Sequence, residues 1–277
     1  MFIFITNMIN AINPNFNTNY KTKCNYTAKR KTSSISFKAH PDFLKLSQHY
    51  ELKASSFFRR GAFYGSPSDH YQDIVNVFRQ IFSPDSVAPK KMLIAGIGDS
   101  QETFSHLATI KDIKKNKPIK DVVDLYTIDL QSKPEPERIH ECSFFEHPWE
   151  PNYAADSFVT ENKKYRYGTY PYYRVNDEIL NFTQNTYANP KKSQWERSLQ
   201  EALPEFEPES FDIISINNTL GYIKEDDVRH GVLRNVVKLL KKGGIFITDP
   251  FYEPRMKKAG VADAFKEIKE GIYQKII

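Results

Sequence analysis

The sequence predicts an α/β fold, in which a mostly parallel central sheet carries helices on both faces. Four apolar runs have the length and composition of buried strands, and they cover residues 90–97, 122–129, 211–217 and 244–249. Helical spacing of apolar residues follows the first run and precedes the last, from Gln101 to about Ile113 and from about Glu225 to Lys242. Strand and helix alternate in this way where each crossover between parallel strands runs through a helix. The pair Gly243-Gly244 is expected to end the second helix.

Three regions follow one another along the chain. Residues 1–40 are basic and rich in Asn, Thr and Ser without sustained periodicity, so we expect a disordered tail. An organelle-targeting or partner-binding arm is the alternative for this tail. Residues 41–89 have apolar residues three and four apart and form an N-terminal helical segment. Residues 90–277 make up the main domain, with an insertion around 131–165.

The basic charge of the chain is concentrated in the tail. The net charge is +5, but residues 1–41 carry +6 and hold no acid, which leaves −1 for the remainder. This distribution argues against a nucleic-acid-binding domain. No apolar window is long enough for a membrane span. The 2 cysteines make no disulfide framework, so we expect a cytoplasmic protein, and the sequence leaves its oligomeric state open.

A glycine-containing turn follows the first strand in "LIAGIGDSQETFS" (residues 93–105). Ligands of open parallel sheets bind at the carboxyl ends of the strands. Gly96 and Gly98 stand at such an end, where the absence of a side chain lets the backbone approach a ligand. A nucleotide-type site and a plain tight turn both fit these two glycines.

An acid at the end of the second strand strengthens the nucleotide-type interpretation. Asp129 can accept hydrogen bonds from both ribose hydroxyls, and Leu130 follows it as a further cofactor-binding candidate. The separation of 33 residues from Gly96 exceeds the usual spacing of about 20. The lysine-rich segment "KDIKKNKPIKD" accounts for the extra length. A strand-end acid in a turn is the alternative reading of Asp129.

The turn lacks the third glycine of the dinucleotide fingerprint and has acids instead. Asp99 and Glu102 would repel a pyrophosphate held at the start of the helix. They suit S-adenosylmethionine, whose amino and sulfonium groups are cationic. Acids also stabilise a helix start by themselves. The sequence therefore favours a methyl donor over NAD.

Five segments, in order, resemble the chemotaxis-receptor (CheR-type) glutamate methyltransferases. The quoted segments are "SSFFRR" with Arg59, "AGIGDSQETFS", "YGTYPYYRV", "NNTLGYI" with Asn218 and Tyr222, and the closing "FKEIKEGIYQKI". Three departures stand beside them. Asn217 replaces the family's Arg, no third strand can be read in "SQWERSLQEALPEFEPES", and the family's N-terminal helical domain is short or replaced.

The resemblance implies a Rossmann-like class I methyltransferase with an antiparallel C-terminal strand pair. It implies that Gly96, Glu102 and Asp129 contact S-adenosylmethionine and that Asn218 lines its adenosine or methionine side, beside the candidates Gly98 and Leu130 named above. Arg59 and Tyr222 would face the transferring methyl group or the acceptor, which would be a protein glutamate carboxylate. Such a carboxylate is ionised at neutral pH, so the chemistry needs no general base.

Other interpretations remain beside this one. The fold could bind cofactor or partners without turnover, or the protein could be an NAD-dependent oxidoreductase. The cluster "HECSFFEH" (residues 140–147) matches no zinc spacing, so no metal is expected. The run "YRYGTYPYYR" is expected to form a hairpin or lid over the cofactor cleft, with single-strand stacking as the alternative.

Overall fold

The computed structural model describes residues 67–82, 88–98, 100–145, 157–165, 168–217, 219–249 and 253–277. All of these lie within one compact unit, Gln48–Ile277. The predicted tail at 1–40 lies outside the described residues, as does the predicted helical segment up to residue 66.

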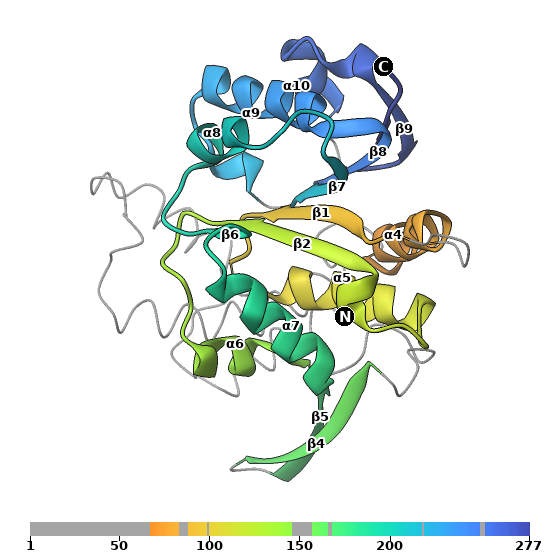
Figure 1. Cartoon of the computed structure of the whole chain (residues 1–277), viewed down its shortest axis with the longest axis vertical. Coiled ribbons are helices and arrows are strands. Elements are labelled where there is room, and N and C mark those ends of the chain that lie inside the picture. Colours follow the sequence, from red (N-terminus) through yellow and green to blue (C-terminus); the bar gives the residue numbers. More distant parts are fainter. Residues whose placement is uncertain are drawn as a thin grey trace, which may run out of the picture. The chain divides into compact units, whose positions relative to one another are not determined.

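A seven-stranded sheet forms the centre of this unit, in the order β6-β2-β1-β7-β8-β10-β9 (Figure 1). The strands β6, β2, β1, β7 and β8 pair in parallel, whereas β10 is antiparallel to both β8 and β9. Their bounds are β1 Lys90–Ala95, β2 Val123–Ile128, β6 Ser193–Gln194, β7 Phe211–Ile216, β8 Leu240–Thr248, β9 Phe265–Lys269 and β10 Ile272–Lys275. This arrangement confirms the predicted Rossmann-like sheet with an antiparallel C-terminal pair.

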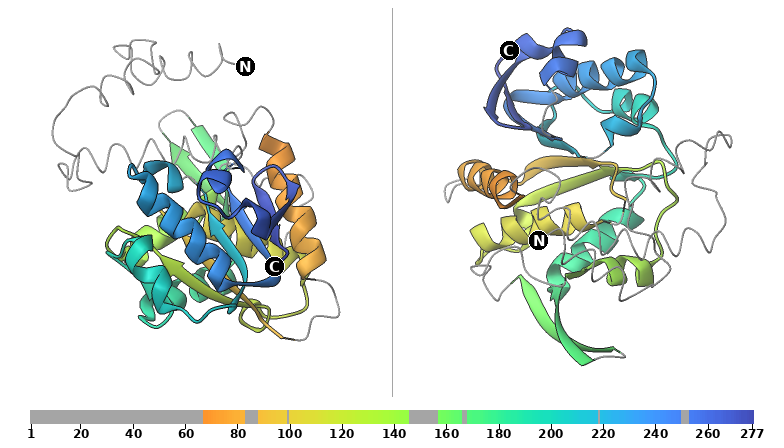
Figure 2. Two further views of the ribbon diagram at one scale, coloured as in Figure 1. Left: turned by 90° about the horizontal axis from the view of Figure 1, so that it is seen from above. Right: turned by 180° about the vertical axis from the view of Figure 1, so that it is seen from behind.

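Helices cover both faces of the sheet (Figures 1 and 2). One face packs against α4 Pro67–Ile81, α5 Gln101–Ile113, α6 Pro136–Cys142 and α7 Asp177–Ala188. The other packs against α8 Leu199–Ala202, α9 Asp226–Leu239 and α10 Glu253–Lys258. Four 3-10 turns connect these elements: η2 Ile119–Asp121, η3 Leu203–Glu205, η4 Leu220–Tyr222 and η5 Ala262–Ala264.

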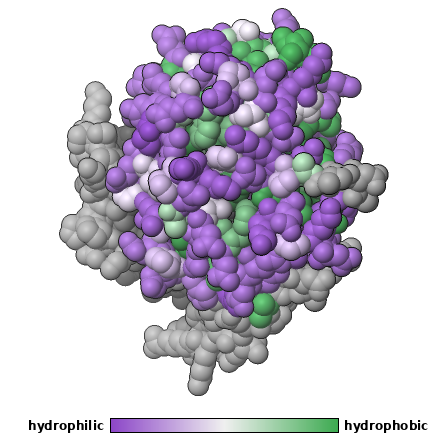
Figure 3. All heavy atoms as spheres, in the orientation of Figure 1, coloured by the Kyte–Doolittle hydropathy of each residue, from purple (hydrophilic) through white to green (hydrophobic). Residues whose placement is uncertain are grey.

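The continuous apolar run in β1 supplies both cores. Neighbouring side chains of a strand point to opposite faces, so Ile94 joins the α4–α5–α7 core while Leu93 joins the α8–α9–α10 core. Each fully buried side chain of this size contributes about 1.5–3 kcal/mol. The face shown in Figure 3 is mainly hydrophilic, with hydrophobic side chains in small groups.

The start of β8 differs from the prediction. The helix predicted to reach Lys242 ends at Leu239, and β8 begins at Leu240. Leu240 pairs with Phe211, but the next paired residue of β8 is Ile245, so the intervening residues form an irregularity in the strand. The predicted helix-ending role of the glycine pair is therefore wrong. Gly243, at φ 80°, adopts the left-handed conformation that this irregularity requires.

The missing third strand is β6, which lies at the start of the segment where none could be read. It has 2 residues and pairs with the end of β2 through Thr127–Ser193 and Ile128–Gln194. A strand this short has no readable alternation. Its place in the sheet comes from pairing with β2.

The predicted insertion contains α6 and most of a second small sheet. This sheet has the order β3-β5-β4, with β3 Phe144–Phe145, β4 Phe158–Tyr165 and β5 Gly168–Val175. The tyrosine-rich run thus lies in a hairpin, as predicted. At the base of the hairpin, Ser157 Oγ donates to Asp112 near the C-terminal end of α5. The glycine turn adjoins the opposite end of α5, so the base of the hairpin lies away from the turn. The contacts of the described residues therefore do not support the predicted lid over the cofactor cleft.

Candidate functional site

The topological switch point of the sheet lies between β1 and β7. From β1 the chain continues to β2 and later β6 on one side, and from β7 it continues to β8 on the other. Loops leaving the two strands diverge here, so the carboxyl edge opens at this place, where ligands of such sheets bind. The predicted glycine turn follows β1 at this edge. Gly96, Gly98 and Ser100 all have positive φ, at 73°, 54° and 64°.

The two glycines of the turn have different surroundings. A Cβ added to Gly98 would meet no atom within 4 Å, so the backbone borders open space there. A Cβ on Gly96 would lie 1.8 Å from Thr219 Oγ1. Thr219, in the loop after β7, therefore occupies the space beside Gly96 that was predicted to admit a ligand. Gly98 retains the predicted open approach.

The acid at the end of β2 contacts the glycine turn directly. Asp129 Oδ2 accepts a hydrogen bond from the Gly98 backbone N–H at 2.8 Å, and Oδ1 accepts one from the Gln131 N–H at 2.8 Å. The Asp129 side chain is buried, whereas the neighbouring Leu130 is 70% exposed. The structure thus brings Gly98, Asp129 and Leu130 to one edge of the sheet.

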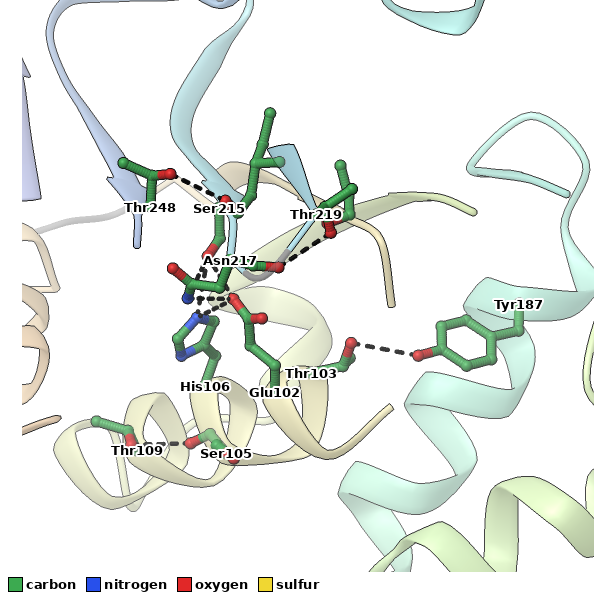
Figure 4. A network of polar contacts seen from close by, with 12 residues as sticks. Glu102, Thr103, Ser105, His106, Thr109, Tyr187, Ser215, Asn217, Thr219 and Thr248 are labelled. Atoms are coloured by element: carbon green, nitrogen blue, oxygen red, sulfur yellow. Dashed lines mark hydrogen bonds and ion pairs between the residues drawn. The ribbon is translucent and has the colours of Figure 1, made fainter. Parts of the chain in front are cut away.

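Glu102 lies in a buried polar network rather than at a free surface (Figure 4). Its Oε1 accepts from Ser215 Oγ, from Asn217 Nδ2 at 2.8 Å and from His106 Nε2 at 3.2 Å. We name Glu102, His106, Ser215 and Asn217 the Glu102 network. It joins the first turns of α5 to the carboxyl end of β7. One carboxylate oxygen of Glu102 therefore accepts hydrogen bonds from within the protein. The sequence had predicted a contact with the cofactor instead.

Sequence reasoning missed three members of this network. The sequence shows Asn217 only as a departure from the family pattern, and it shows Ser215 only as part of a strand. His106, which the sequence analysis does not single out, pairs with Glu102. The available signal was the spacing of four residues between Glu102 and His106, which places both on one face of a helix.

Three predicted site residues remain: Arg59, Asn218 and Tyr222. Arg59 and Asn218 lie outside the described residues. Tyr222 ends η4, its backbone N–H donates to Thr219 O at 3.0 Å, and its side chain is 78% exposed. Its predicted place beside the acceptor stays a prediction.

Other kinds of site are located elsewhere or not found among the described residues. A cavity of about 620 Å³ lies at the opposite, amino edge of the sheet, where Lys90, Asp212 and Gly244 line it. Over the described ranges, no three His, Cys, Asp or Glu side chains come together as a metal site. Of the helices that the structure describes, none combines the length and apolarity needed to cross a membrane.

The hydrogen-bond acceptors and the apolar surface at the edge between β1 and β7 suit a cationic adenosine cofactor. Asp129 places a carboxylate at the end of β2, beside the open space at Gly98. Leu130 offers an exposed apolar side chain next to it. Asn217 Oδ1 is buried and finds no hydrogen-bond partner in the described part of the chain. These groups are acceptors and apolar surface, which fit an adenosine with an ammonium-bearing tail.

One family model matches part of this chain. Residues 162–248 match the family model described as "Methyltransferase domain". No curated protein sequence matches this chain.

Solved structures with a similar arrangement include several methyltransferases. The N-methyltransferase NodS from Bradyrhizobium japonicum WM9, in complex with S-adenosyl-L-homocysteine, has 12% identity and a TM-score of 0.38, over 83% of this chain and 97% of that chain. The CurJ carbon methyltransferase has 11% identity and a TM-score of 0.44, over 86% of this chain and 61% of that chain. An O-methyltransferase family protein from Burkholderia thailandensis has 12% identity and a TM-score of 0.35, over 85% and 70%. At such low identity none of these likenesses indicates a substrate for this chain.

The family match covers part of the described sheet. The matched residues run from β4 to the end of β8 and include β7, one of the two strands at the switch point. The described chain therefore has a Rossmann-like α/β fold, and residues 162–248 of it are similar to a methyltransferase domain.

Proposed function

We propose that this protein binds S-adenosylmethionine at the edge between β1, β2 and β7, and transfers its methyl group to a carboxylate. The contact between Asp129 and the Gly98 N–H carries the cofactor half of this proposal. It brings the acid at the end of β2 and the open side of the glycine turn to one place. Ribose hydroxyls would bind the remaining lone pairs of Asp129, and the adenine ring would pack on Leu130.

Calorimetry with S-adenosylhomocysteine tests the cofactor site. We expect binding to the wild type and a loss of at least about tenfold in Asp129→Ala, because charged hydrogen bonds are each worth about 1.5–3 kcal/mol. Asp124→Ala is the matched control, since Asp124 is also an acid of β2 but pairs with Lys192. Equal affinities for the wild type and Asp129→Ala would remove the proposed site.

A protein glutamate is the proposed acceptor. Its support is the ordered series of sequence motifs, including Arg59 and Tyr222. The bound cofactor supplies a methyl group on a positively charged sulfur, which leaves as the neutral thioether. An acceptor carboxylate that received this methyl group would become a methyl ester. The protein contributes by holding the carboxylate oxygen at near-attack distance and by excluding water.

Transfer of a radiolabelled methyl group tests the acceptor. Purified protein and labelled S-adenosylmethionine are incubated with lysate, and the modified proteins are treated with alkali. Esters release volatile methanol under these conditions, whereas N-methyl and C-methyl groups remain on the protein. We expect alkali-labile label, reduced in Tyr222→Ala. Alkali-stable label would contradict the carboxylate acceptor and leave methyl transfer in place.

A protein that binds the cofactor without turnover is the second candidate. Two observations favour it: Asn217 stands where the resembling family has Arg, and Thr219 packs against Gly96. This candidate predicts normal binding of S-adenosylhomocysteine and no label transfer to any lysate protein.

A further inference from the structure

Two buried atoms of the Glu102 network have no hydrogen-bond partner in the described part of the chain. They are Asn217 Oδ1 and His106 Nδ1. Buried polar atoms are nearly always paired, so such an atom calls for a missing donor. Both belong to side chains that contact the same carboxylate oxygen, Glu102 Oε1.

Glu102 determines the chemical character of both atoms. An ionised carboxylate can only accept hydrogen bonds, and three donors converge on its Oε1. Asn217 must therefore turn its NH₂ group towards Glu102, which leaves its Oδ1 as an acceptor. His106 must carry its proton on Nε2, which leaves Nδ1 as an acceptor in the neutral ring.

The two acceptors differ in position. The His106 ring packs edge-to-face on Phe78 of α4, with centroids 5.2 Å apart, and so belongs to the core. Asn217 directly follows β7 at the switch point. Its backbone oxygen accepts from Thr219 Oγ1 at 2.9 Å, and Thr219 lies against Gly96. Asn217 is therefore the acceptor at the ligand-binding edge.

An acceptor oxygen with a carboxylate behind it favours a positively charged N–H donor. S-adenosylmethionine has two cationic centres, but its sulfonium has no hydrogen to donate. Its ammonium group has three. We infer that Asn217 Oδ1 binds the ammonium group of the cofactor, and that Glu102 is a positioning residue that orients the Asn217 amide. This inference rests on the proposed function.

A pair of ligands separates this role from a structural one. S-adenosylhomocysteine keeps the ammonium group, whereas its deaminated analogue has hydrogen in that place and is otherwise the same. Calorimetry measures the affinity of both for the wild type, Asn217→Ala and Glu102→Gln. We expect both variants to lose at least about tenfold in affinity for S-adenosylhomocysteine, the loss that one charged hydrogen bond predicts. The affinity for the deaminated analogue should stay within about twofold of wild type.

Thr248→Val is the matched control. Thr248 is a buried residue at the end of β8, and its hydroxyl donates to Ile216 O at 3.1 Å. We expect this variant to treat the two ligands alike. If Asn217→Ala fails to fold, as judged by circular dichroism, Glu102→Gln, which preserves the size of the side chain, decides the question.

Each contrary result has a distinct meaning. Equal losses for both ligands would show that the network is only structural and overturn the inference, and no loss for either would mean that a buried water serves Asn217 and would overturn it as well. In both cases the proposed function stands, because the wild type still binds. Failure of the wild type to bind either ligand would overturn the proposed function and the inference together.

Discussion

The carboxylate of Asp129 and the backbone N–H of Gly98 are joined by a hydrogen bond of 2.8 Å. This bond connects the end of β2 to the turn after β1 within the protein itself. The acid is thus held in place by the protein itself, before any ligand binds. Such preorganisation reduces the ordering cost that ligand binding would otherwise carry.

Asp129→Asn should lower the free energy of unfolding by about 1–2 kcal/mol, the cost of leaving one buried donor unpaired. Both Asp129 oxygens accept from backbone N–H groups, so an amide NH₂ in place of either one faces another donor. Urea denaturation measures the change. Asp124→Asn, which loses a partly exposed pair with Lys192, should cost less than about 1 kcal/mol. Equal losses would mean that the two amide contacts of Asp129 contribute nothing specific.

Alanine at the two glycines of the turn should separate strain from packing. Gly98→Ala meets only the penalty of its positive φ, about 1–2 kcal/mol. Gly96→Ala carries the same penalty and also clashes with Thr219, so its loss of stability should be clearly larger. Thermal unfolding of both variants compares the two.

Thr219→Gly removes the atoms that the new Cβ at position 96 would meet. In the double variant, Gly96→Ala should therefore cost no more than Gly98→Ala does alone. A cost that stays unchanged by Thr219→Gly would contradict the packing explanation.

Leu130→Ser should leave stability within about 0.5 kcal/mol, because a side chain that is 70% exposed contributes little to the core. Affinity for S-adenosylhomocysteine should fall by about tenfold if the adenine ring covers this side chain. Calorimetry and urea denaturation of one preparation give both quantities. Ile276→Ser, at another exposed apolar residue, is the control and should change neither.

The start of α8 offers a pH-dependent prediction. Ser198 and Glu201 form a capping box, and hydrogen bonds from the Ser198 hydroxyl and N–H lower the pKa of Glu201 below its ordinary value. A lowered carboxylate pKa adds stability above the unfolded-state pKa, and this stability is lost as the pH falls through the folded-state pKa. Ser198→Ala should raise the pKa of Glu201 towards its ordinary value, as NMR titration can measure. The lost cap should cost about 1 kcal/mol at neutral pH. An unchanged Glu201 pKa would contradict the assignment.

Much of the fold could be predicted because its signals are local. The strands around Leu93, Leu125 and Ile214 are short continuous apolar runs, and α5 has the bounds that its periodicity predicts. The bounds of α9 and β8 could not be predicted in this way. A glycine pair after a helix resembles a helix end, and only the pairing of Leu240 with Phe211 makes the same residues part of a strand.

Within the candidate site, the sequence locates the residues that directly follow β1 and β2, but not the long-range contacts that join Ser215 and Asn217 to Glu102. Gly98, Asp129 and Leu130 follow β1 and β2 directly, so strand prediction locates them. Asn217 also follows a strand, but its significance comes from a contact with Glu102 across 115 positions of the chain. No periodicity within either segment encodes such a pair.

The sequence by itself determined the alternation of strands and helices, the glycine turn and the acid after the second strand, because each of these is a property of neighbouring residues. Only the tertiary structure decided that Thr219 occupies the space beside Gly96 and that the Asn217 amide donates a hydrogen bond to Glu102. Those contacts exist because the parallel sheet places β1 and β7 side by side, although they are more than a hundred residues apart in the chain.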